Sequence, residues 1–95
     1  MAATAQQASD FEAALNSDGY TQVVSRSLPG GHATQVHAHD FSVRALVTEG
    51  DITLTTDAGA TTYRAGEVFV MPAGCTHRET VGTDGVAYIA GTRPM

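Results

Sequence analysis

Lysine and tryptophan are absent from this sequence of 95 residues, and cysteine occurs once, as Cys75. The five basic residues are all arginines scattered along the chain, and the net charge is −5. No basic patch is available to neutralise a phosphate backbone, so we expect no nucleic-acid partner. The lack of lysine also excludes Schiff-base chemistry at a side chain. A single cysteine excludes an internal disulfide.

Long apolar runs are missing as well. No segment approaches the roughly 18 apolar residues needed to span a bilayer. Residues 1–10 are small and polar and lack the apolar centre of a signal peptide. From these absences we expect a soluble, cytoplasmic protein with no membrane partner.

The remaining composition is typical of one small folded domain. Hydrophobic residues make up 42% of the chain and charged residues 16%, a balance found in globular rather than disordered proteins. A second compact core would need roughly 50 residues of its own, so we predict a single domain over residues 1–95. A chain of this size buries only about two-thirds of its unfolded surface. A metal, a ligand or a second subunit is therefore expected to add stability.

One helix is predicted, over residues 9–18. Ser9 and Glu12 have the spacing of a capping box, and Gly19 provides a left-handed end. The apolar side chains expected on one face of this helix are Phe11, Ala14 and Leu15.

From residue 20 onward the pattern changes to short β segments separated by turn signals. Strands at this spacing, without intervening helices, are typical of an antiparallel sandwich or barrel. We therefore predict an all-β barrel over residues 20–93. Its expected strands are 20–28, 34–48 with a break near Asp40, 52–56, 61–63, 68–71, 76–81 and 86–92.

Two of the four histidines, His37 and His39, are separated by one residue. On a strand such residues point to the same face about 6.6 Å apart, so their imidazoles can share a metal ion. His77 follows the turn at residues 72–74 and is the candidate third ligand. Two exposed histidines on an edge strand remain the alternative. His32 lies in a glycine turn and is expected to face solvent.

Two stretches of the sequence, from residue 31 to 50 and from 66 to 77, resemble the two motifs of the cupin family. The marker residues are Gly31, His37, His39 and Gly50 in the first stretch and Gly66, Pro72, Gly74 and His77 in the second. The chain looks like a small single-domain bacterial cupin. This resemblance implies the cupin double-stranded β-helix, a jelly-roll barrel, here with a short N-terminal helix.

The sequence departs from the cupin pattern at Val43, where the family usually has a carboxylate ligand, and at Val81, where an asparagine is common. The remaining three-histidine set resembles those of cysteine dioxygenase and the acetylacetone-cleaving dioxygenases, which are iron enzymes. The resemblance implies that His37, His39 and His77 hold one divalent metal ion. We rank iron(II) first, followed by manganese, nickel or zinc, because imidazole accepts all of them.

Three neutral imidazoles leave the full charge of a divalent ion uncompensated, which favours small anionic chelating substrates. They also leave coordination positions open for substrate and O₂. This favours a metal-dependent, dioxygenase-like oxidoreductase acting on a small anionic metabolite. The alternatives are a non-catalytic module that binds or senses a small molecule, and a structural barrel stabilised by its metal. Small cupins often pair, and so small a core is compatible with a homodimer.

Strand parity supplies further candidates for the site. Glu79 shares the parity of His77, which predicts an inward role as a catalytic base, a fourth ligand or a partner for a histidine. A shifted register would instead put Glu79 on the surface. Asp40 is expected to face outward, and Cys75 to serve packing. The weaker alternatives are a replacement carboxylate ligand at Asp40 and a metal-binding or redox-sensitive thiolate at Cys75. The residues predicted to line a pocket, or equally to fill a core, are Gln35, Phe41, Val43, Ala45, Phe69 and Met71.

Overall fold

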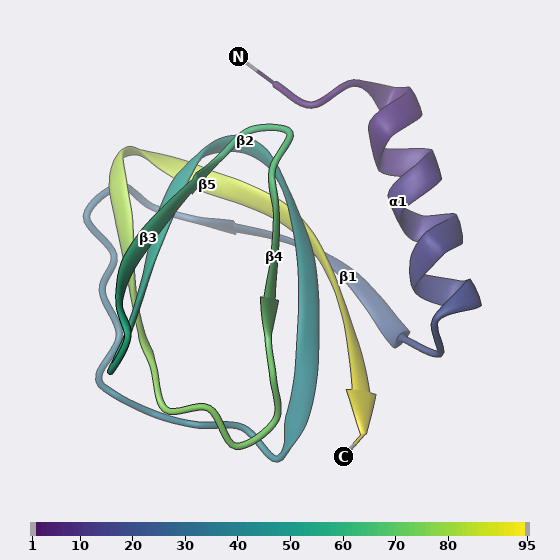
Figure 1. The fold of residues 1–95 in the computed structure, drawn as a ribbon. Helices are drawn as coiled ribbons and strands as arrows, with labels where there is room; N and C mark the ends of the chain where they lie inside the picture. Colours follow the sequence, from purple (N-terminus) through teal and green to yellow (C-terminus); the bar gives the residue numbers. More distant parts are fainter. Residues whose placement is uncertain (1, 95) are drawn as a thin grey trace.

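The computed structural model describes residues 2–94 and contains one helix beside a β-barrel (Figure 1). Among these residues no helix is long and apolar enough to cross a membrane. The elements in chain order are α1 (Ala5–Ser17), β1 (Thr21–Leu28), β2 (Phe41–Thr56), β3 (Gly59–Arg64), β4 (Val68–Met71) and β5 (Arg78–Pro94).

The barrel is built around two long antiparallel strands, β2 and β5, which pair from Phe41↔Pro94 to Thr55↔Arg78. The first half of β2 also pairs with β4, and its second half pairs with β3. The second half of β5 pairs with β1. The segment before β2 bonds to the first half of β5 through the bridge Ala33↔Thr80, and to His77, just before β5, through the bridge His37↔His77. Each long strand therefore contributes to both walls, which confirms the predicted jelly-roll barrel.

Both long strands run through positions where turns are predicted. The register of β2 against β5 shifts between Val47 and Glu49 and again between Gly50 and Ile52. Such bulges bend a strand without ending it. Gly50 and Gly85 have φ of 72° and 82°, and a Cβ at Gly50 would collide with the Gly85 carbonyl oxygen. The predicted breaks at residues 49–51 and 82–85 are thus wrong, because the glycines form bends at which the two backbones approach closely.

The segment predicted as the start of a strand, residues 34–40, is mostly irregular. Among the described residues its one bridge is His37↔His77, just before β5, and β2 itself begins at Phe41. The predicted break near Asp40 therefore coincides with the start of the regular strand. Strand parity does not apply before Phe41, which matters for the residues assigned to the pocket.

Helix α1 begins four residues earlier than predicted, with Thr4 as its N-cap. The Gln7 amide donates to Thr4 Oγ1 at 3.1 Å, and the Thr4 amide donates to Gln7 Oε1 at 2.7 Å. This capping box replaces the one predicted at Ser9, because residues 5–8 are good helix formers and extend the helix upstream. Gly19 ends the turn after the helix with φ of 80°, as expected.

The helix packs on the outer side of the barrel wall (Figure 1). Phe11 and Leu15 are buried against Tyr20 and Leu46 in a small cluster that is separate from the barrel interior. The predicted Ala14 is exposed. The interior core contains Ala45, Val47, Ile52, Leu54, Phe69, Met71, Val81, Val86, Tyr88 and Ala90. The inside of the barrel is thus available for a site that α1 does not touch.

Candidate metal centre

Three histidines converge inside one end of the barrel. His37, His39 and His77 each offer a ring nitrogen, and these nitrogens lie within 4.8 Å of one another. The backbones of His37 and His77 exchange two hydrogen bonds, each 2.8 Å long. The His39 carbonyl accepts from the Gly74 amide at 2.8 Å, which ties the second histidine to the turn before the third. Among the described residues this is the group able to hold a metal ion.

Backbone carbonyls orient two of the imidazoles. His37 Nδ1 lies 2.7 Å from the Gln35 carbonyl oxygen, and His77 Nδ1 lies 3.0 Å from the Cys75 carbonyl oxygen. A carbonyl only accepts, so each Nδ1 carries the proton and each Nε2 keeps a free lone pair. A backbone carbonyl in this role is the usual partner that orients a metal-binding histidine.

His39 fits the same function in a different way. Its ring stacks on Phe41 with the centroids 4.8 Å apart. Within residues 2–94 its buried Nδ1 has no hydrogen-bond partner. Burial lowers the pKa of His39, the nearby His37 and His77 lower it further, and Glu79 and Asp40 act in the opposite direction. A neutral imidazole is the form that binds a metal, so the donor set fits a divalent ion.

Glu79 lies beside two of the three histidines. Its Oε2 is 3.4 Å from His77 Nε2 and 3.6 Å from His37 Nε2. The side chain is 19% exposed, whereas that of His77 is 2% exposed. The Glu79 amide donates to Thr34 Oγ1 at 2.9 Å, which fixes the strand position next to the site. The carboxylate is therefore within reach of the same space that the imidazoles face.

The histidines open into a cavity of about 340 Å³. Four of the six predicted pocket residues line it: Phe41, Val43, Phe69 and Met71. Ala45 does not, because it lies fully buried in the barrel core. Gln35 does not either, because its side chain is exposed in the irregular segment before β2. Its contribution is the carbonyl that orients His37.

Several lining residues escaped the sequence reasoning. His32 was expected in solvent, but it is partly buried and lines the cavity, because the chain after Gly31 folds back along β5. The others come from β1, β2 and β5 or from the segment before β2, and they are Val24, Arg26, Leu28, Thr34, Leu54, Tyr88, Ala90 and Thr92. Alternation along β1 and β5 could have indicated which of their residues share a face. The sequence did not show that these two distant strands pair, so it did not show that those faces line the cavity.

The two weaker candidates stand apart from the cluster. Asp40 is exposed, as expected, and is not among the converging donors. Cys75 is partly buried against the interior core, and its thiol is 3.9 Å from the Thr76 carbonyl oxygen. Cys75 acts on the site through its backbone carbonyl, which orients His77.

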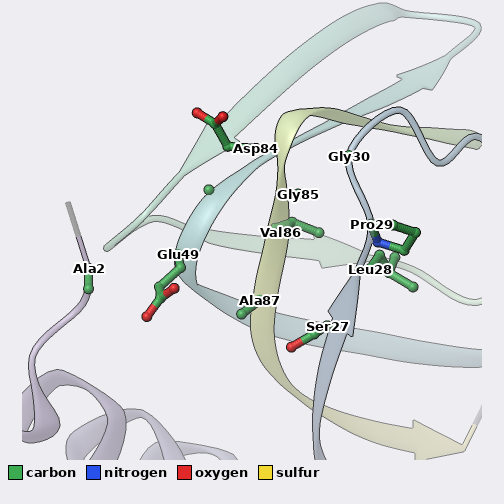
Figure 2. A pocket seen from close by; sticks show the side chains of 11 residues that line it. Ala2, Ser27, Leu28, Pro29, Gly30, Glu49, Asp84, Gly85, Val86 and Ala87 are labelled. Atoms are coloured by element: carbon green, nitrogen blue, oxygen red, sulfur yellow. The ribbon is translucent and has the colours of Figure 1, made fainter.

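A second, larger hollow of about 650 Å³ opens elsewhere, between the end of β1 and the central bends of β2 and β5 (Figure 2). Glu49 and Asp84 are its charged side chains, and both are acidic. No histidine or cysteine is among the described residues that line it. Its size therefore does not make it the better candidate site.

Comparisons with known proteins agree with this architecture. The cupin domain family (Cupin_2) matches residues 23–89. An RmlC-like cupin from Shewanella frigidimarina is 26% identical, with a TM-score of 0.64 over 77% of this chain and 65% of that chain. A cupin-2 domain protein from the same organism is 22% identical, with a TM-score of 0.63 over 77% and 69% of the two chains. A cupin domain from Bordetella pertussis is 21% identical, with a TM-score of 0.58 over 77% and 79%.

The chain thus spans about two-thirds of the length of the two Shewanella proteins. None of the curated proteins compared with it matches. The family match covers most of the chain, including all three histidines, the whole of β2 and most of β5. This chain therefore belongs to the cupin domain family.

Proposed function

We propose that this protein is a non-haem, metal-dependent enzyme of the dioxygenase-like class that acts on a small anionic chelating metabolite. The observation that carries the proposal is the convergence of three oriented imidazoles at a cavity whose other walls are largely apolar. A divalent ion held by His37, His39 and His77 would act as a Lewis acid and, as iron(II), would bring O₂ and substrate together. We rank iron(II) ahead of manganese, nickel and zinc.

The residues of the chain supply positioning and proton transfer. Phe41, Phe69 and Met71 exclude water from the reacting end of a bound ligand. Glu79 lies close enough to that end to take a proton from an acidic carbon or thiol as the anion forms. A dioxygenase transfers both atoms of O₂ to the substrate, so this reaction needs no external reductant.

Metal content tests the first part of the proposal. Tag-free wild-type protein should carry about one metal ion per chain by mass spectrometry, and His77→Ala should lose it. His32→Ala is the matched control, because His32 lines the same cavity outside the triad and should retain the ion. Absence of metal after reconstitution with iron(II) or zinc(II) would refute the enzyme proposal and leave a non-catalytic binding barrel.

Oxygen consumption tests the second part. We expect the iron-loaded protein to consume O₂ with a small β-diketone or thiol and the His77→Ala variant to consume none. A ligand-dependent rise in melting temperature without O₂ uptake would instead favour the sensing module.

A further inference from the structure

The cavity is electrostatically different from the rest of the molecule. The protein has a net charge of −5 with its histidines counted as neutral, yet the charged side chains that line the cavity, among the described residues, are one arginine, Arg26, and one carboxylate, Glu79. Arg26 is the residue with a permanent positive charge among the described residues that line it. The lining thus lacks the negative excess of the whole protein, so it disfavours an anion less than the surrounding surface does.

Arg26 owes its position to the register of β1 on β5. Its Cα pairs with that of Tyr88, between the pairs Val24↔Ala90 and Leu28↔Val86. Residues 24, 26 and 28 share one face of the strand, and all three line the cavity. The Tyr88 phenol is buried among them, and burial raises its pKa, while Arg26 lowers it and Glu79 raises it. Tyr88 is therefore close enough to Arg26 and to Glu79 for both charges to act on its phenol.

The guanidinium of Arg26 is available to a ligand. Within residues 2–94 the arginine that forms an ion pair with a carboxylate is Arg44, whose Nη1 is 2.6 Å from Asp18 Oδ2. Arg26 has no such partner there, and it is exposed on β1. Arg26 is exposed, whereas the exposed fraction of the side chain is 32% at His37 and 2% at His77. Arg26 thus lies at the rim of the cavity, and His77 lies at its depth.

Much of the remaining lining is apolar. Val43, Leu54 and Phe69 are among these residues and offer no side-chain hydrogen bond. A ligand that fits the histidines, the apolar lining and Arg26 together has a metal-chelating donor group at one end, a short apolar body and an anionic group at the other end. At about 340 Å³ the cavity is near the lower end of the usual range for small-molecule sites.

We propose that Arg26 binds a carboxylate of the substrate, so that the substrate class is a short carboxylic acid whose second, chelating donor group faces the three histidines. This inference rests on the proposed function and narrows it. The planar guanidinium can hold both carboxylate oxygens at once, which a neutral side chain cannot do. The ligand enters with its chelating end first and its carboxylate remains at the rim.

Two probes that differ in one group test this assignment. Pentane-2,4-dione is a chelating β-diketone, and 2,4-dioxopentanoate is the same molecule with a carboxylate in place of one methyl group. Their dissociation constants are measured by calorimetry on zinc-loaded wild-type protein and on Arg26→Gln, Arg26→Lys and Arg64→Gln. Arg64 is an exposed arginine on β3 outside the cavity and serves as the matched control.

We expect wild type to bind the carboxylate probe at least about 10-fold more tightly than the diketone. Arg26→Gln should remove this preference by weakening the carboxylate probe alone. Arg26→Lys should restore part of it, because charge returns without the planar fork. Arg64→Gln should leave both constants unchanged. Circular dichroism of each variant checks that the fold is intact.

The outcomes separate this inference from the function on which it rests. If the carboxylate probe binds through Arg26 while the diketone does not bind, the assignment of Arg26 is supported and the chelating function fails. If the diketone binds and the carboxylate adds no affinity, the chelating function is supported and the Arg26 assignment is overturned. Equal weakening of both probes by Arg26→Gln, or binding of neither probe, also overturns it.

Discussion

Leu15 attaches α1 to the barrel, and its truncation is predicted to destabilise the whole domain. The side chain is fully buried between the helix and the outer wall. Leu15→Ala removes three carbon groups, which corresponds to roughly 2–3 kcal/mol of lost transfer free energy. The cavity left behind adds to this, because one of its walls is the backbone of Gly91, which has no side chain to fill it. We expect a total loss of about 3 kcal/mol.

For a domain of this size, that loss lowers the melting temperature by about 10–25 °C. Urea unfolding followed by circular dichroism measures the free energy directly. Glu12→Ala, an exposed change on the same helix, should alter it by no more than about 0.5 kcal/mol. Metal content of the folded Leu15→Ala protein should stay at the wild-type level, because α1 lies outside the cavity. A loss below about 1 kcal/mol would refute the view that this contact secures the helix.

The same contact allows a sharper test by a double-mutant cycle. A Cβ at Gly91 would lie 3.0 Å from Leu15 Cδ1 and 3.3 Å from Tyr20 Cβ. Gly91→Ala should therefore be less destabilising by about 1 kcal/mol or more when Leu15 is already alanine, because the new methyl then fills the cavity. Additive effects of the two changes would contradict the packing described for this face.

Four further predictions concern the cap, a bend, the cavity wall and the proposed role of Glu79 as a base. Thr4→Ala should cost about 1 kcal/mol in thermal melts, because half of the capping box is lost; an unchanged melt would contradict this. Gly50→Ala should cost about 2 kcal/mol or more in urea titrations, because φ is positive and the new Cβ collides with Gly85; a wild-type midpoint would refute it. Burial raises the pKa of Tyr88, so the stability contributed by its neutral form is complete below about pH 10 and is lost as the pH rises through the higher folded-state pKa. Tyr88→Phe should therefore lose less stability than wild type between about pH 10 and 12 in circular dichroism titrations, and parallel losses would count against this. Glu79→Gln should keep the metal content but lower turnover about 100-fold or more; loss of the metal would identify Glu79 as a ligand instead.

The sequence by itself determined the class of fold and the three histidines. Short β segments with glycine turns predict a barrel whatever their pairing, and a single helical segment precedes them. His37 and His39 are separated by one residue, and this spacing, together with the spacing to His77, matches a known motif. These features depend on neighbouring residues along the chain, so they can be read without knowing the pairing of distant strands.

Tertiary structure decided the continuity of β2 and β5 and the composition of the cavity. Gly50 and Gly85 look like turns in the sequence, but contact between two distant backbones converts them into bends. Arg26 and Tyr88 are opposite each other because residues about 60 positions apart pair across β1 and β5. Nothing local to either residue specifies that register, since it depends on which strands lie side by side in the folded barrel. The histidines were predictable because their spacing can be read along the chain. Most of the cavity around them was not, because its lining depends on the pairing of strands that are distant in the sequence.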